Sequence, residues 1–399
     1  MKPFPCNPKR PATAAAAALV SLCVSSQTPA AEPWHLPGQP LAAAGKVNDF
    51  LTAPDVQGTN IWNPVLNSWD TGNFEASTLR PGLTESTLPI AIKVAREHLK
   101  MAERPEINDR FWMISTRSLT SSTCNMDLDS PEFRVHRLDC RGRLTPTTLD
   151  EYLGALTPER QVVVYVHGNR MASNQIVNRS FSVYRKIANC VENRPVDWVI
   201  WSWPSSKQGI LVHDARRKAA RTDAQGLYLG WLLQRQVKQT ESTKMIGFSF
   251  GSRVITGALH SLAGGKLGGR ILPGPPTTGA TVDVGLVAPA IDTNWLSEKG
   301  YHAKATQNLD HLALLYNRRD AVLKRYWRLN KVRGRAALGY TGPRSFAPRA
   351  DGTDLPIVAR DYSAYIGPRH DELGYYTKSR IAANIMADLI NDSDDSESQ

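Results

Sequence analysis

The feature that most constrains the fold of this chain is a regular alternation of short apolar runs with longer amphipathic segments. The runs predict strands at 111–117, 132–138, 161–168, 196–203, 243–249, 282–290, 311–317 and 355–361. Helical spacing is clearest at 173–190, 213–237, 250–263, 320–332 and 377–390. The middle runs are continuously apolar and β-branched, as strands buried on both faces are. The alternation predicts an α/β fold with a mainly parallel twisted sheet and helices on both faces.

The first thirty-one residues have the order of a secretory signal peptide. Basic residues precede a short apolar run, and small residues follow it, which predicts export after cleavage near Ala30 or Ala31. An uncleaved N-terminal anchor is the alternative. No later stretch of the sequence reaches the ~18–20 apolar residues that a membrane helix needs, so we expect no transmembrane helix after cleavage.

The remaining sequence divides into three predicted segments. Residues 32–105 are rich in Pro, Gly, Asn and Thr, which predicts an N-terminal extension that is partly mobile or caps the main body. Residues 106–392 contain the alternating pattern and are predicted to form one α/β domain. Residues 393–399 are acidic and predicted to be disordered.

The formal net charge is +11, and many of the basic residues fall in the segment 318–349. Such a segment could contact an anionic lipid, glycan or nucleic acid, or it could simply be a solvated face. We expect no specific nucleic-acid binding, because the sequence has neither a basic motif interleaved with aromatic residues nor a zinc knuckle.

Three of the five cysteines lie beyond the predicted signal peptide: Cys124, Cys140 and Cys190. They allow three pairings in an oxidising compartment, of which Cys124–Cys140 is favoured. Cys190 would then remain as a buried thiol in a predicted helix.

The sequence Gly247-Phe248-Ser249-Phe250-Gly251 fits the pattern G-x-S-x-G. It lies where an apolar strand is followed by an amphipathic helix, which is the context that a nucleophile elbow requires. Side chains at 247 and 251 would collide in such a turn, so glycine is expected at both positions. Ser249 is therefore the candidate nucleophile, although a plain strand-to-helix corner is the alternative.

An activated serine needs a base, and the nine histidines can be sorted by position. Only His370 follows the last predicted strand in a loop at the edge where an open α/β sheet assembles its site. The acid is Asp320 or Asp292, since each follows a strand, and Asp320 is favoured. Asp320 could instead cap the helix that follows it.

Two backbone donors are expected to stabilise an oxyanion. Phe250 follows the serine, and the turn VHGNR would supply the second donor from Asn169 or a neighbour, with Gly168 allowing close approach. The sequence contains no C-x-x-C, H-E-x-x-H or P-loop motif, so we expect neither a metal nor a cofactor.

Several stretches resemble the α/β-hydrolase superfamily, and more narrowly a bacterial branch mostly of unknown function. They are VVVYVHGNR, VIWSWPS, IGFSFGSRVITGAL, LVAPAID, LALLYNRRDAVLK and the histidine loop, and FWMISTR is similar to the opening strand of that branch. The resemblance spans about residues 110–390 and implies that Ser249, Asp320 and His370 form a triad, with Asn169 and Phe250 at the oxyanion hole. Two features depart from it: Phe248 stands where many relatives have histidine, and 325–352 is an insertion.

These observations predict an exported serine hydrolase, esterase-like or lipase-like, that acts on a small-molecule or lipid ester or a thioester through an acyl-enzyme. The alternative is a non-catalytic protein of the same fold that binds an anionic polymer or a membrane surface through its basic face. A binding protein would have no need of a serine, an acid and a histidine at three separate strand ends.

Overall fold

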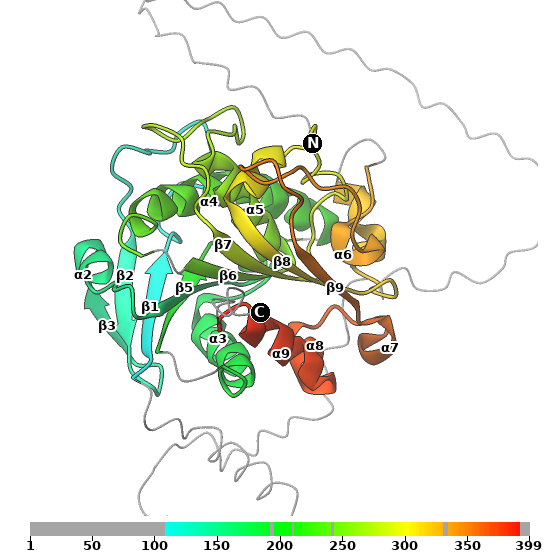
Figure 1. Cartoon of the computed structure of the whole chain (residues 1–399), viewed down its shortest axis with the longest axis horizontal. Coiled ribbons are helices and arrows are strands. Elements are labelled where there is room, and N and C mark those ends of the chain that lie inside the picture. Colours follow the sequence, from blue (N-terminus) through cyan, green and yellow to red (C-terminus); the bar gives the residue numbers. More distant parts are fainter. Residues whose placement is uncertain (1–107, 192–194, 210, 241–242, 330–333, 392–399) are drawn as a thin grey trace, which may run out of the picture. The chain divides into compact units, whose positions relative to one another are not determined.

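The computed structural model describes residues 108–191, 195–209, 211–240, 243–329 and 334–391. These residues contain a nine-stranded sheet in the order β3-β2-β1-β5-β4-β6-β7-β8-β9 (Figure 1). The strands are β1 (Arg110–Ser115), β2 (Arg134–Leu138), β3 (Leu144–Thr147), β4 (Gln161–Val166), β5 (Val196–Ser202), β6 (Thr243–Phe248), β7 (Val282–Val287), β8 (Leu309–Tyr316) and β9 (Ile357–Asp361). Strand β2 pairs antiparallel with both β1 and β3. All the other neighbouring strands pair parallel. The predicted mainly parallel sheet is confirmed.

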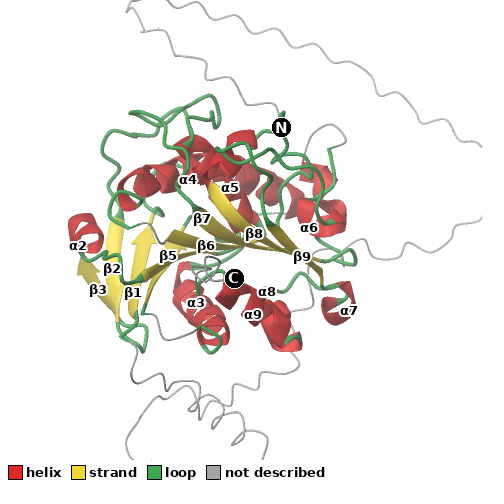
Figure 2. Cartoon of the chain, viewed as in Figure 1, coloured by secondary structure: helices red, strands yellow, loops and turns green. Residues whose placement is uncertain are grey.

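Helices cover both faces of this sheet (Figure 2). The helices are α2 (Leu149–Gly154), α3 (Ser173–Ala188), α4 (Leu211–Gln236), α5 (Phe250–Leu262), α6 (Leu338–Thr341), α7 (Ser363–Ile366), α8 (Glu372–Lys378) and α9 (Arg380–Asp388). Two 3₁₀ segments, η3 (Ala303–Asn308) and η4 (Leu323–Leu329), flank β8. Helices α4 and α5 pack together on one face, and α3 packs with α8 and α9 on the other. This is the α/β-hydrolase fold.

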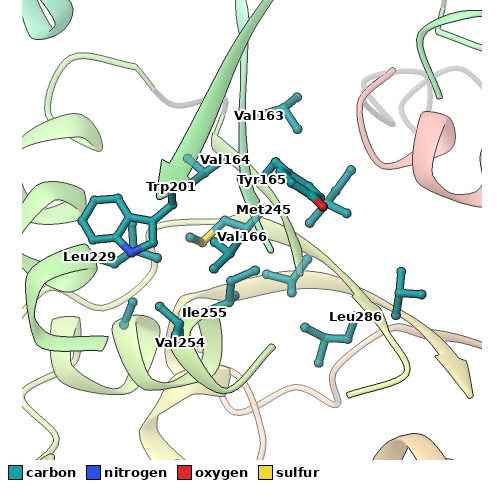
Figure 3. Packing of buried hydrophobic residues seen from close by; sticks show 14 of the residues in the cluster. Val163, Val164, Tyr165, Val166, Trp201, Leu229, Met245, Val254, Ile255 and Leu286 are labelled. Atoms are coloured by element: carbon teal, nitrogen blue, oxygen red, sulfur yellow. The ribbon is translucent and has the colours of Figure 1, made fainter. Parts of the chain in front are cut away.

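The apolar core lies between the sheet and these two helical layers (Figure 3). All six residues of β4 are buried, because this central strand has a helical layer on each face. Alternate residues of a strand point to opposite faces. Tyr165 stacks on Trp198 and donates to Glu372 of α8, so Val163 and Tyr165 face the layer of α3 and α8. Val164 and Val166 therefore face α4 and α5.

Three elements differ from the sequence prediction. The edge strand β3 was not predicted, since the run LTPT is polar, contains Pro146 and is mostly exposed. The helix expected over 320–332 is instead the 3₁₀ segment η4. The helix expected over 377–390 begins at Arg380, where Ser379 caps α9, and α8 lies before it in a stretch predicted as loop.

The favoured disulfide between Cys124 and Cys140 is wrong. Cys140 and Cys190 are both free thiols, and Cys124 is disulfide-bonded to neither of them. Cys124 follows β1 and Cys140 follows the antiparallel β2, so the two cysteines leave the sheet at opposite edges. Cys190 is half-buried rather than buried, because it lies just beyond the end of α3.

Several predicted segments lie outside the described residues: the signal peptide 1–31, the N-terminal extension 32–105, the acidic tail 393–399 and part of the basic segment 318–349. Across the described ranges, no helix combines the length and the apolar character that crossing a membrane requires.

Candidate active site

Ser249 occupies the junction between β6 and α5, at the carboxyl edge of the sheet. Ser249 has φ 52° and ψ −115°, a left-handed conformation that is costly for any residue with a Cβ atom. Three backbone hydrogen bonds hold it there: Ser249 N–H donates to Val287 O at 3.0 Å, and Ser249 O accepts from Ser252 N–H at 3.1 Å and from Ala290 N–H at 3.2 Å. These bonds fix the serine at the N-cap of α5.

Glycine is required on both sides of Ser249 because other backbone comes very close. A Cβ atom at Gly251 would lie 2.0 Å from Val166 O, which belongs to β4. A Cβ atom at Gly247 would lie 2.7 Å from Ile255 Cδ1 and 3.0 Å from Gly251 C. The predicted collisions are thus present at both positions, and the contact of Gly251 also brings the end of β4 against the start of α5.

His370 lies between α7 and α8 and connects two of the predicted site residues. Its Nε2 lies 2.9 Å from Ser249 Oγ, and its Nδ1 lies 2.6 Å from Asp320 Oδ2. An ionised carboxylate can only accept, so Nδ1–H donates to Asp320 and Nε2 is left to accept from the serine hydroxyl. The Phe248 ring packs against the imidazole at a centroid distance of 4.9 Å.

Asp320 makes both of the contacts that the sequence left open, a cap of the following segment and a hydrogen bond with a histidine. Its Oδ1 accepts from the N–H groups of Val322 and Leu323, each at 2.9 Å, and thereby caps η4. Its Oδ2 accepts from His370. The Asp320 side chain is fully buried and the His370 side chain is 14% exposed, so the carboxylate is fixed while the ring reaches the surface.

Asp292, the alternative acid, belongs to a different network. It forms an isolated β-bridge with Ala337 of the insertion, and its side chain is hydrogen-bonded with Tyr326. The structure therefore brings Asp320, rather than Asp292, to His370.

The two predicted backbone donors lie on the segments that Gly251 holds together. Phe250 is the first residue of α5, where N–H groups have no partner within the helix. Asn169 follows β4, and its Oδ1 accepts from Arg170 N–H at 2.8 Å. A Cβ atom at Gly168 would lie 2.7 Å from the Phe248 ring, so glycine lets this turn approach the elbow. Within the described ranges, neither the Asn169 N–H nor the Phe250 N–H has an assigned acceptor.

A second histidine at this edge, His167, is unsuited to proton transfer. It is fully buried, its Nδ1–H donates to Gly168 O at 2.9 Å, and its Nε2 accepts from Trp203 N–H at 3.3 Å. Burial lowers the pKa of His167 to about 3, so the ring is neutral and fully occupied by backbone groups. Its role is to join the turn after β4 to the end of β5.

A buried carboxyl group that the sequence did not predict, that of Glu372, lies beneath the histidine loop. Both oxygens of Glu372 lie within hydrogen-bonding distance of Tyr165 Oη, at 2.9 and 3.0 Å. Burial raises the pKa of Glu372 to about 7. The available signals were the acidic residue two positions after His370 and a tyrosine within the otherwise aliphatic β4.

Among the residues that the structure describes, one group of side chains offers atoms that could ligate a metal: Asp283, Asp310 and His311, at the amino edge of the sheet. Each carboxylate already has a cationic partner, Lys244 for Asp283 and Arg349 for Asp310. These pairings neutralise the charge that would attract a metal ion, so the residues fit an ion-pair cluster better than a metal site.

Comparisons with known proteins agree with this architecture. Residues 147–344 match the model of a family described as "Alpha/beta hydrolase of unknown function (DUF900)". No curated protein shows a significant match.

Similar solved structures include three esterases. An inhibited form of esterase B from Lactobacillus rhamnosis is 15% identical and covers 77% of this chain and 96% of its own, with a TM-score of 0.33. A hyperthermophilic esterase from the archaeon Pyrobaculum calidifontis is 15% identical, and the match covers 84% of this chain and 97% of the esterase, with a TM-score of 0.31. A propionate-bound esterase from Thermogutta terrifontis is 11% identical, and the match covers 59% of this chain and 86% of the esterase, with a TM-score of 0.29. Scores this low carry no argument about activity.

Proposed function

We propose that this chain, a member of the α/β-hydrolase superfamily, is a serine hydrolase that cleaves a carboxylic ester or thioester through an acyl-enzyme. One observation carries the proposal: the His370 ring bridges Ser249 Oγ at 2.9 Å and Asp320 Oδ2 at 2.6 Å. A nucleophile, a base and an orienting acid within hydrogen-bonding distance of one another are the constellation that acyl transfer requires.

In the first half of the reaction, Ser249 Oγ attacks the acyl carbon while its proton passes to His370 Nε2. The N–H groups of Phe250 and Asn169 donate to the oxyanion, and the imidazolium is held by Asp320. The tetrahedral intermediate expels the alcohol or thiol, which leaves with the proton from Nε2.

In the second half, His370 Nε2 takes a proton from water, and the resulting nucleophile attacks the acyl-enzyme. The second tetrahedral intermediate releases the carboxylic acid, and the proton returns to Ser249 Oγ. Each step uses only groups that lie at the carboxyl edge of the sheet.

The direct test is labelling with a fluorophosphonate probe, which reacts covalently with activated serines. Wild type is expected to label at Ser249, Ser249→Ala to lose the label and His370→Ala to label far more slowly. Ser252→Ala is the matched control, since Ser252 lies on the same helix but donates to Gly247 O. Folded wild type that fails to label, or that labels at another residue, would contradict the proposal.

We also propose that the protein is exported, on the basis of the charged, apolar and small-residue order of residues 1–31. Expression of the full chain in a bacterial host with fractionation of its compartments tests this. Intact mass should show cleavage near Ala30 or Ala31 in the exported fraction, whereas a full-length cytoplasmic product would count against export.

A further inference from the structure

A polar cavity lies between the segment after β7 and the part of the insertion that follows η4. Its volume is about 380 Å³. The segment after β7 contributes Thr293, Asn294 and Ser297, and the insertion contributes Arg335, Thr341 and Arg344. Hydroxyl, amide and guanidinium groups thus dominate the lining, and no carboxylate is among the residues that line it.

Neither Arg335 nor Arg344 has an acidic partner among the described residues, whereas two other arginines of the basic segment do. Arg318 pairs with Asp361, and Arg349 pairs with Asp310 and Asp351. Across the described ranges, neither Arg335 nor Arg344 has an ion pair or an assigned hydrogen-bond acceptor for its guanidinium group. Both arginines are exposed at this one polar cavity, and guanidinium groups can bind a carboxylate or phosphate through paired N–H groups.

Backbone hydrogen bonds tie this cavity to the strand ends around Ser249. Leu338 N–H donates to Ile291 O at 2.8 Å, and Thr293 N–H donates to Ala336 O at 3.1 Å. The insertion and the segment after β7 are therefore one hydrogen-bonded unit.

The cavity also lies within reach of a small substrate bound at Ser249. Ala290 N–H donates to Ser249 O at 3.2 Å, and Thr293 follows only three residues later. Three residues of fully extended chain span at most about 11 Å, so the cavity begins within about that distance of the residue bonded to Ser249. This distance is short enough for a substrate of moderate length to span.

We propose that Arg335 and Arg344 form a subsite that binds an anionic group, a carboxylate or a phosphate, carried by the ester substrate. The proposal rests on the hydrolase function proposed above and adds the substrate class: an ester with a negative charge remote from the scissile carbonyl. Two arginines of the basic segment 318–349 would then contact an anion.

The kinetic test compares matched charged and neutral substrates. The charged probes are 4-nitrophenyl monoesters of dicarboxylic acids of increasing length, and the neutral probes are the same compounds with the far carboxyl methylated. We expect the ratio of kcat/KM for charged over neutral probe to fall at least about tenfold in the Arg335→Gln, Arg344→Gln double variant. Arg328→Gln is the matched control, because Arg328 is an exposed arginine of the same basic segment that does not line the cavity.

A binding measurement separates this proposal from the proposed activity. Calorimetry with the Ser249→Ala variant uses suberate and, separately, inorganic phosphate, and so distinguishes the two anion types. Binding of either probe that weakens at least about tenfold in the double-arginine background supports the subsite, even if no ester is hydrolysed. Failure of the Ser249→Ala variant to bind either anion, or binding and kinetic ratios unchanged by the double substitution in folded protein, would overturn it.

Discussion

Two histidine–aspartate pairs lie at opposite edges of the same sheet, and only one of them faces a serine. At the carboxyl edge, His370 Nδ1 lies 2.6 Å from Asp320 Oδ2. At the amino edge, His311 Nδ1 lies 2.9 Å from Asp283 Oδ1. The two pairs are similar in residue type and contact distance, so their surroundings must decide what each can do.

The surroundings differ in what else contacts the carboxylate and the ring. Asp283 Oδ2 also accepts from Lys244 Nζ at 2.5 Å, so a permanent cation shares its charge. The second oxygen of Asp320 is held by two backbone N–H groups, and the second nitrogen of His370 faces Ser249 Oγ. Of these two pairs, only the one at the carboxyl edge has a serine and the N-terminus of a helix beside it, and parallel strands place both at that edge.

The largest effect that would sharpen this comparison is expected from Asp320→Asn. The amide can still cap η4, but it no longer holds the tautomer of His370 that leaves Nε2 free to accept, so kcat should fall by about 10⁴. The measurement is hydrolysis of 4-nitrophenyl butyrate, with circular dichroism to establish that the variant is folded. Asp283→Asn is the matched control and should keep kcat within about threefold. Equal losses in the two variants would remove the distinction between the pairs.

The second effect concerns the free energy of unfolding, and here the larger change is expected at the amino edge. Asp283→Asn leaves the buried Lys244 ammonium without the carboxylate that it contacts. Removing one partner of a buried ion pair costs about 3–5 kcal/mol in the free energy of unfolding. Urea unfolding of wild type and Asp283→Asn measures this difference, with Asp361→Asn as the control, since Asp361 pairs with Arg318 at the exposed surface. A loss below about 1 kcal/mol would show that the amino-edge pair is not a structural ion pair.

The smallest effect concerns the pH dependence of stability through Glu372, which lies under the histidine loop. The groups near its carboxyl are Tyr165 on β4, Arg179 on α3, His370 and Asp371 in the loop, and Tyr376 on α8. Burial raises the pKa of Glu372 to about 7, above its ordinary value of 4.5, so the folded state binds the proton more tightly than the unfolded state does. This contribution to stability is fully present below pH 4.5 and is lost as the pH rises toward 7.

Glu372→Gln keeps an acceptor for Tyr165 Oη and cannot ionise. Between pH 4.5 and 7, the unfolding free energy of wild type should therefore fall steadily relative to that of Glu372→Gln. Above that range, the difference between the two proteins should stay constant. Chemical denaturation at closely spaced pH values tests this. A difference that stays constant over the whole range would mean that Glu372 titrates normally.

Much of this molecule could be predicted from local sequence. Eight of the strands could be predicted, and the central ones most directly, because a central parallel strand is apolar on both faces and its pattern needs no partner to be recognised. The elbow could be predicted because Gly247 and Gly251 are required by backbone contacts at a strand-to-helix turn. The edge strand β3 could not, because pairing on one side only leaves a polar, exposed sequence with no distinguishing periodicity.

What the sequence determined by itself was the sheet, the elbow and the short set of polar residues that follow strand ends. What only the tertiary structure decided was which of these residues meet. Asp320 and Asp292 each follow a strand, yet only the packing of the loop before α8 brings His370 to Asp320. Cys124 and Cys140 are close in sequence, but the antiparallel pairing of β1 and β2 carries them to opposite edges. Local composition specifies secondary structure because its physical causes are local, whereas a contact between distant side chains depends on how every intervening element packs.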